Sequence, residues 1–209
     1  MIKTLLVYDN KDANLGDFFE DCFSNSNTHL AACPDIEIDS INSRALNELT
    51  ILLKTSSLNN NPFLFISYSH GSENELLQNG YVPYVSETIN HTCLKNSFSY
   101  CFACHTGKKL GKTLVDNGTK CFIGYNNEVY IQLFFNAKPH FVECATHGLK
   151  SFIEGKSIEK TIVDMKEKYT EKIDEFYIKD MLTASLFLHN RDSLVYYGNS
   201  SMVIEDFII

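Results

Sequence analysis

The sequence predicts an α/β fold with a mainly parallel central sheet flanked by helices. Short, continuous apolar runs, typical of strands that are buried on both faces, recur along the chain. Segments with helical spacing of apolar residues separate these runs, as the crossovers between parallel strands require. The dipeptide Asn79-Gly80 adds one short β-hairpin to this alternation.

The first half of the chain contains three predicted strands, at residues 2–8, 35–41 and 62–68. Apolar residues recur at helical spacing over 15–23 and 45–53, which predicts helices there. The polar stretch 24–34 is expected to be a loop. The run Asn59-Asn60-Asn61-Pro62 breaks the chain before the third strand.

The second half continues the pattern and then becomes mainly helical. Strands are predicted at 97–102, 119–125 and 193–198, and helices at 107–116, 141–152 and 158–169. Asn117-Gly118 marks the end of the first of these helices. The apolar tail 202–209 is expected to pair at a sheet edge. Because no repeat or linker interrupts the chain, residues 1–209 are expected to form a single domain.

Composition disfavours several classes of partner and cofactor. The formal net charge is −8 and the chain has two arginines, Arg44 and Arg191, so no basic surface for nucleic acid is expected. No apolar run approaches the roughly 20 residues of a membrane span, and the apolar start is too short for a signal peptide. We therefore expect a cytoplasmic protein that binds neither nucleic acid nor membrane. The seven cysteines lack the spacing of a disulfide framework and are expected to be reduced thiols.

Two short motifs carry the chemistry, and each follows a predicted strand. Ser69-His70-Gly71 follows 62–68, and Ala103-Cys104-His105-Thr106-Gly107 follows 97–102. A thiol with a pKa near roughly 8.5 needs a base or a positive field to become a nucleophile at neutral pH. If the two strands are neighbours, His70 supplies the base. A helix beginning at Gly107 would also place the sulfur at a helix N-terminus, where a thiolate is stabilised.

These motifs resemble those of the caspase-like cysteine peptidases, the clan that contains caspases, metacaspases, clostripain-like enzymes, separases and bacterial CHAT-domain proteases. Ser69-His70-Gly71 is similar to the histidine motif of that clan, and Cys104-His105-Thr106 followed by Gly107 to the metacaspase and CHAT pattern. The resemblance covers roughly residues 60 to 200. It implies a caspase-like fold and a cysteine endopeptidase. Cys104 would be the nucleophile and His70 the general base or acid. The amides of Gly71 and Cys104 would be the oxyanion donors. The chemistry needs no metal and no other cofactor.

The resemblance also implies partners. The expected substrate is a protein. A small CHAT-type protease is expected to stay inactive until a regulatory protein or a signal releases it, in antiphage defence or regulated cell death. Neither a basic nor an aspartate preference is expected next to the scissile bond. Phe102 stands where metacaspases carry an acid, and caspases bind aspartate with several arginines. Residues 126–139, which include Phe134 and Phe135, are expected to form an activation or specificity loop.

Other interpretations remain open. A catalytically silent caspase-like interaction module is one, and a redox or metal module is another, because Cys101 and Cys104 form a C-x-x-C sequence. Alternation along the strand places Cys101 on the face opposite Cys104, in the core. A second His-Gly dipeptide, His147-Gly148, lies within a predicted helix and is not expected to be catalytic. His105 is expected to line the site without transferring the proton.

Overall fold

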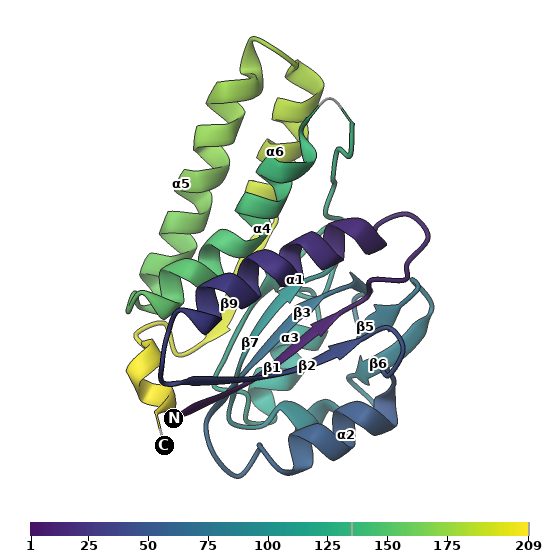
Figure 1. Cartoon of the computed structure of the whole chain (residues 1–209), viewed down its shortest axis with the longest axis vertical. Coiled ribbons are helices and arrows are strands. Elements are labelled where there is room, and N and C mark those ends of the chain that lie inside the picture. The colour runs from purple at the N-terminus through teal and green to yellow at the C-terminus, as the bar shows by residue number, and fades with distance from the viewer. Residues whose placement is uncertain (135, 209) are drawn as a thin grey trace.

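A six-stranded sheet forms the centre of the computed structural model, which describes residues 1–134 and 136–208 (Figure 1). Its strand order is β2-β1-β3-β7-β8-β9. The strands are β1 (Ile2–Tyr8), β2 (Ile36–Asn42), β3 (Phe63–Tyr68), β7 (Ser97–Phe102), β8 (Cys121–Tyr125) and β9 (Leu194–Gly198). All neighbours pair in parallel except β8 and β9. The predicted fold class is confirmed.

Helices cover both faces of the sheet, and each face has its own hydrophobic core. The larger core lies under α1 (Gly16–Ala31), α4 (Lys138–Ile153), α5 (Ile158–Tyr177) and α6 (Met181–Asp192). The smaller core lies under α2 (Glu48–Ser56), the 3-10 helix η1 (His91–Leu94) and α3 (Leu110–Asp116). The hairpin of α5 and α6 extends away from the sheet (Figure 1). In the described part of the chain, no helix has both the length and the apolar character needed to cross a membrane.

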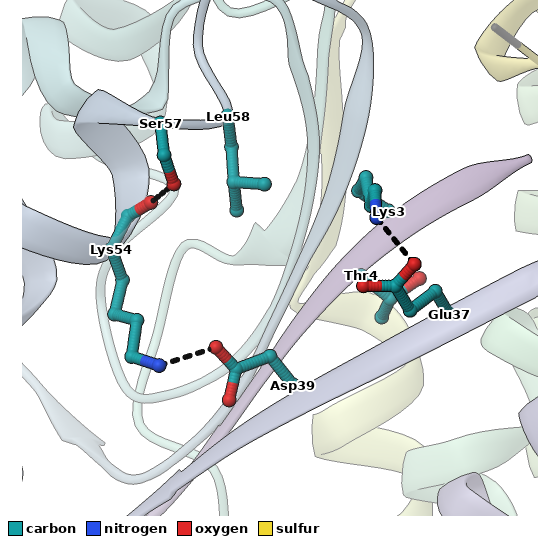
Figure 2. Close-up of a pocket in the computed structure, with 7 residues that line it drawn as sticks. All are labelled: Lys3, Thr4, Glu37, Asp39, Lys54, Ser57 and Leu58. Atoms are coloured by element: carbon teal, nitrogen blue, oxygen red, sulfur yellow. Dashed lines mark hydrogen bonds and ion pairs between the residues drawn. The ribbon is translucent and has the colours of Figure 1, made fainter.

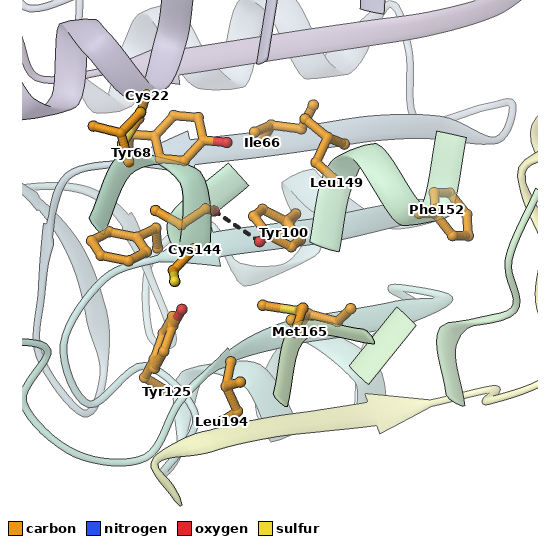
Figure 3. Close-up of a cluster of buried hydrophobic side chains, with 14 of the residues drawn as sticks. Cys22, Ile66, Tyr68, Tyr100, Tyr125, Cys144, Leu149, Phe152, Met165 and Leu194 are labelled. Carbon is orange, nitrogen blue, oxygen red and sulfur yellow. Dashed lines mark hydrogen bonds between the residues drawn. The ribbon is translucent and has the colours of Figure 1, made fainter. Parts of the chain in front are cut away.

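Hydrogen bonds from buried tyrosines tie the larger core to its helices. Tyr100 of β7 donates to the carbonyl of Ala145 in α4 at 2.8 Å (Figure 3). The Tyr68 hydroxyl lies 2.6 Å from that of Ser26 in α1. These bonds fix the helices over the strands whose ends carry the two motifs.

A small second sheet lies beside the main one. It contains β4 (His70–Gly71), β5 (Glu75–Gln78) and β6 (Val82–Ser86) in antiparallel pairing. The turn between β5 and β6 is closed by a hydrogen bond from the Tyr81 N–H to the Gln78 carbonyl at 3.2 Å, and its central residues Asn79 and Gly80 both adopt positive φ, 50° and 76°. The predicted hairpin of β5 and β6 is confirmed, and the candidate histidine lies in β4, which pairs with β5.

Three predicted segments are wrong. Residues 24–31 continue α1, because Ser26 and Leu30 are fully buried and give this polar stretch an inward face. The helix predicted from Gly107 begins only at Leu110. The C-terminal tail forms a 3-10 turn, η2 (Ile204–Phe207), whose Phe207 packs against both Phe98 and Phe152.

Two expectations fall partly outside the described residues. Ile209 belongs to the predicted tail and Phe135 to the predicted loop, and neither is described by the structure. α6 was not predicted, because its apolar residues do not form a clear helical stripe.

The second His-Gly dipeptide lies inside α4, as expected, and its glycine has a packing role. A Cβ on Gly148 would lie 2.3 Å from Sδ of Met165 in α5 and 3.0 Å from the Tyr100 ring. Gly148→Ala is therefore expected to lower the free energy of unfolding by about 1–3 kcal/mol, since the buried Met165 side chain or the helices must shift. Urea denaturation measures this. Ser185→Ala, on the exposed face of α6, serves as the control and should change stability by less than about 0.5 kcal/mol.

Candidate active site

The two motifs emerge side by side from neighbouring strands. β3 and β7 pair in parallel with Tyr68 opposite Phe102, so both strands end at the same level. One further bond, from the Ser69 N–H to the Phe102 carbonyl at 3.4 Å, holds the chains together as they leave the sheet. His70 and Cys104 then line one pocket. The expectation that the two motifs share one edge of the sheet is confirmed.

Gly71 lies directly against the loop that carries Cys104. A Cβ at this position would meet the Cys104 carbonyl oxygen at 2.7 Å and the Thr106 methyl at 2.7 Å. The Ser72 N–H donates to the Glu75 carbonyl, and bonded pairs alternate along an antiparallel ladder. The N–H of Gly71 therefore points away from β5. This geometry suits a donor for a developing oxyanion.

The sulfur of Cys104 is half-buried and accepts a hydrogen bond from the Val129 N–H at 3.3 Å. Burial raises the pKa of this thiol, and the charge of Glu128 raises it further, while the Val129 N–H lowers it. The prediction that the sulfur lies at a helix N-terminus is wrong, because turns separate Cys104 from Leu110. Gly107 is held against β8 by a hydrogen bond from its N–H to the Tyr125 carbonyl at 2.8 Å, and helical geometry begins only at Leu110.

Asp12 is the site residue that sequence reasoning missed. Its Oδ2 lies 3.0 Å from Nε2 of His70, and its side chain is only 7% exposed. Its Oδ1 accepts the N–H groups of Asn14 and Leu15 at the turn before α1. Burial alone would raise the pKa of Asp12, but these two N–H groups and His70 lower it below its usual value. The ring of His70 also packs edge-on against Phe19, so the imidazole is held on two sides.

The pocket that joins His70 and Cys104 is narrow. Its volume is about 10 Å³, room for roughly one water molecule. Leu15 and Phe19 line it from α1 and the turn before it, Phe102 from the end of β7, and Val129 and Ile131 from the segment after β8. The site is therefore apolar apart from its two candidate catalytic groups and Ser69.

The cysteines of the C-x-x-C sequence lie on opposite sides of the sheet. Cys101 is buried in the smaller core, as predicted, whereas Cys104 lies beside Phe102 on the side of the larger core. Burial raises the pKa of Cys101 well above its usual value. Among the residues that the structure describes, His, Cys, Asp and Glu form no group of three or more suited to a metal ion.

A larger pocket lies at the opposite end of the sheet (Figure 2). Lys3 and Glu37, paired across β1 and β2, form an ion pair at its wall. Lys54 forms a second with Asp39 at 2.6 Å. Because these charges are paired with one another and lie at the start of β1, we assign this pocket no part in the site.

Two solved structures share this arrangement of strands and helices. A complex of the pro- and mature domains of RgpB from Porphyromonas gingivalis superposes with a TM-score of 0.69 at 13% identity. The structure of the Arg-specific cysteine proteinase gingipain R (RgpB) gives 0.62 at 15%. The chain has a caspase-like fold. At this identity the likeness shows the fold alone.

The match covers 99% of this chain and 49% or 48% of the two solved chains. The chain thus spans about half the length of the structures it matches. No family model and no curated protein matches the sequence. The roles of Cys104, His70 and Gly71 remain predictions, now with a defined geometry.

Proposed function

We propose that this protein is a cysteine peptidase that hydrolyses peptide bonds in a protein substrate, with Cys104 as the nucleophile and His70 as the base. The observation that carries the proposal is the single pocket in which the ends of β3 and β7 bring these two side chains together. The gingipain fold supports the peptidase class. Arginine specificity is a property of gingipain R and is not transferred to this chain.

The proposed reaction begins with proton transfer. The Asp12 carboxylate accepts a hydrogen bond from the protonated Nε2 of His70. Nδ1 is then unprotonated and can accept the thiol proton of Cys104. The thiolate attacks the scissile carbonyl and forms a C–S bond, and the oxygen becomes an oxyanion that the N–H groups of Gly71 and Cys104 stabilise. His70 then protonates the leaving amine as the C–N bond breaks. Water hydrolyses the thioester and restores the thiol.

A second candidate is a caspase-like interaction module without catalysis. The raised pKa of Cys104 favours it, because a protonated thiol is a weak nucleophile. The finer assignments, namely a CHAT-type protease with a regulatory protein partner and a role in antiphage defence or regulated cell death, are part of the proposal and rest on the motif resemblance.

The reaction of the seven thiols with iodoacetamide tests the proposal. Cys104 is expected to react fastest at neutral pH, and His70→Ala is expected to slow it by about tenfold or more, since the thiolate loses its base. Mass spectrometry of the alkylated peptides identifies the site and rate for each cysteine. His147→Ala removes the histidine of the other His-Gly dipeptide and should change nothing at Cys104. Equal rates at Cys104 in the wild type and His70→Ala would favour the silent module.

A further inference from the structure

Residues 126–130, which follow β8, run beside the C-terminal end of α6. The N–H of Asn126 donates to the carbonyl of Ser193 at 2.9 Å. Two residues later, the carbonyl of Glu128 accepts a hydrogen bond from Nε2 of His189 at 3.0 Å. The even-numbered positions of this segment thus bond to α6 and its C-cap.

The odd-numbered positions bond to the loop that carries the nucleophile. The carbonyl of Asn127 accepts the N–H of His105 at 2.9 Å, and the N–H of Val129 donates to Sγ of Cys104 at 3.3 Å. The segment therefore places α6 on one side and Cys104 on the other.

Asn190 of α6 supports this segment where it has no strand neighbour. The Asn190 side chain is fully buried, and its Nδ2 donates to the Tyr130 carbonyl at 2.7 Å while its Oδ1 accepts the Tyr130 N–H at 2.9 Å. One amide side chain thus makes the pair of bonds that a neighbouring strand would make. The bonds lie one residue beyond the N–H that reaches the sulfur.

We propose that Asn190 is a positioning residue that holds the Val129 N–H against the sulfur of Cys104. The donor is useful because the thiolate forms in a half-buried, largely apolar pocket, where a hydrogen bond to the charged form is worth more than in water. The inference rests on the proposed role of Cys104 as a nucleophile, and goes beyond it by assigning a function to α6.

The surroundings of the sulfur oppose ionisation of the thiol, and a hydrogen-bond donor offsets this effect. The pKa of Cys104 is raised by burial and then by the carboxylate of Glu128, whereas the bond from Val129 lowers it. The Glu128 carboxylate is itself bonded to the Tyr130 hydroxyl at 2.5 Å. The titratable groups on the elements around Cys104 are His70 on β4, Asp12 before α1, His105 in the same loop, Glu128 and Tyr130 on the segment, and His189 on α6.

The test is the rate of Cys104 alkylation by iodoacetamide, an uncharged reagent, measured as a function of pH. In Asn190→Ala the apparent pKa of Cys104 is expected to rise by about one unit, so that alkylation at neutral pH falls about tenfold. The rates should converge at high pH, where the thiol is ionised in both proteins. Val129→Pro removes the donor itself and is expected to give the same shift if Asn190→Ala does not fold.

A matched control is available in Asn90. It is buried and its side-chain amide also bonds the backbone twice, with Nδ2 donating to the Tyr84 carbonyl at 2.9 Å and Oδ1 accepting the Ser86 N–H at 2.7 Å. Asn90→Ala should lower the melting temperature and leave the Cys104 pH profile unchanged. If Asn190 only stabilised the fold, Asn190→Ala would likewise lower the melting temperature and leave the pH profile of Cys104 unchanged.

Two results in folded variants would overturn the inference. An unchanged pH profile in Asn190→Ala and Val129→Pro would show that the N–H does not act on the thiolate. A faster reaction at every pH would show instead that the segment covers the thiol. Both results come from alkylation of Cys104 and do not require that the protein hydrolyses peptides. The proposed function is tested separately by His70→Ala.

Discussion

Gly71→Ala is expected to lower peptide hydrolysis by at least about a hundredfold, which is the typical effect of losing one oxyanion donor. The added methyl group cannot fit, because the Cys104 carbonyl would lie 2.7 Å from it and the Ala103 side chain 2.9 Å. The loop or β4 must move, which would disrupt the proposed oxyanion site of the Gly71 and Cys104 N–H groups. Turnover of a fluorogenic peptide selected on the wild-type protein measures the loss.

Alkylation by iodoacetamide separates this effect from general damage to the site. That reaction forms no tetrahedral oxyanion, so Gly71→Ala should retain most of its rate at Cys104 while peptide hydrolysis falls. Gly148→Ala is the matched control, since it overcrowds a buried glycine far from the pocket. It should lose stability and retain turnover. Equal turnover in Gly71→Ala and the wild type would exclude Gly71 from the oxyanion hole.

The strands and their motifs could be predicted because both signals are local. An apolar run such as Ser97–Phe102 is visible in the sequence, and so is a cysteine directly after it. Parallel pairing then brings the two strand ends together. The positions of Cys104 and His70 in one pocket follow from this reasoning.

The parts of the site that were missed depend on contacts between residues distant in the chain. Asp12 and Asn190 lie in different loops and helices from the residues they contact, and neither belongs to a recognisable motif. The prediction that a helix N-terminus stabilises the Cys104 thiolate was also wrong. Gly107 is held against Tyr125 and Val195 of β8 and β9, so the helix starts later and its N-terminus lies away from the sulfur. A single aspartate or asparagine in a polar loop carries no signal until the fold shows its partner.

Asp12→Asn is expected to lower peptide hydrolysis by about 10²- to 10⁴-fold. The asparagine retains an oxygen for the N–H groups of Asn14 and Leu15 but presents an amide N–H to Nε2 of His70. The imidazole proton then moves to Nδ1, which can no longer accept the proton of Cys104. Turnover of the same peptide measures the loss. Asp180→Asn, which alters a carboxylate that caps α6 away from the pocket, is the matched control and should retain turnover.

The same substitution has a consequence for stability against pH. The pKa of Asp12 is lowered in the folded protein, so its carboxylate stabilises the fold above the usual aspartate value of 3.8, and this contribution is lost as the pH falls through the lowered pKa. The difference in unfolding free energy between wild type and Asp12→Asn should therefore shrink as the pH falls below about 4. Urea denaturation at a series of pH values measures it. A difference that stays constant into strong acid, together with full turnover in the variant, would show that the Asp12 carboxylate does not orient His70.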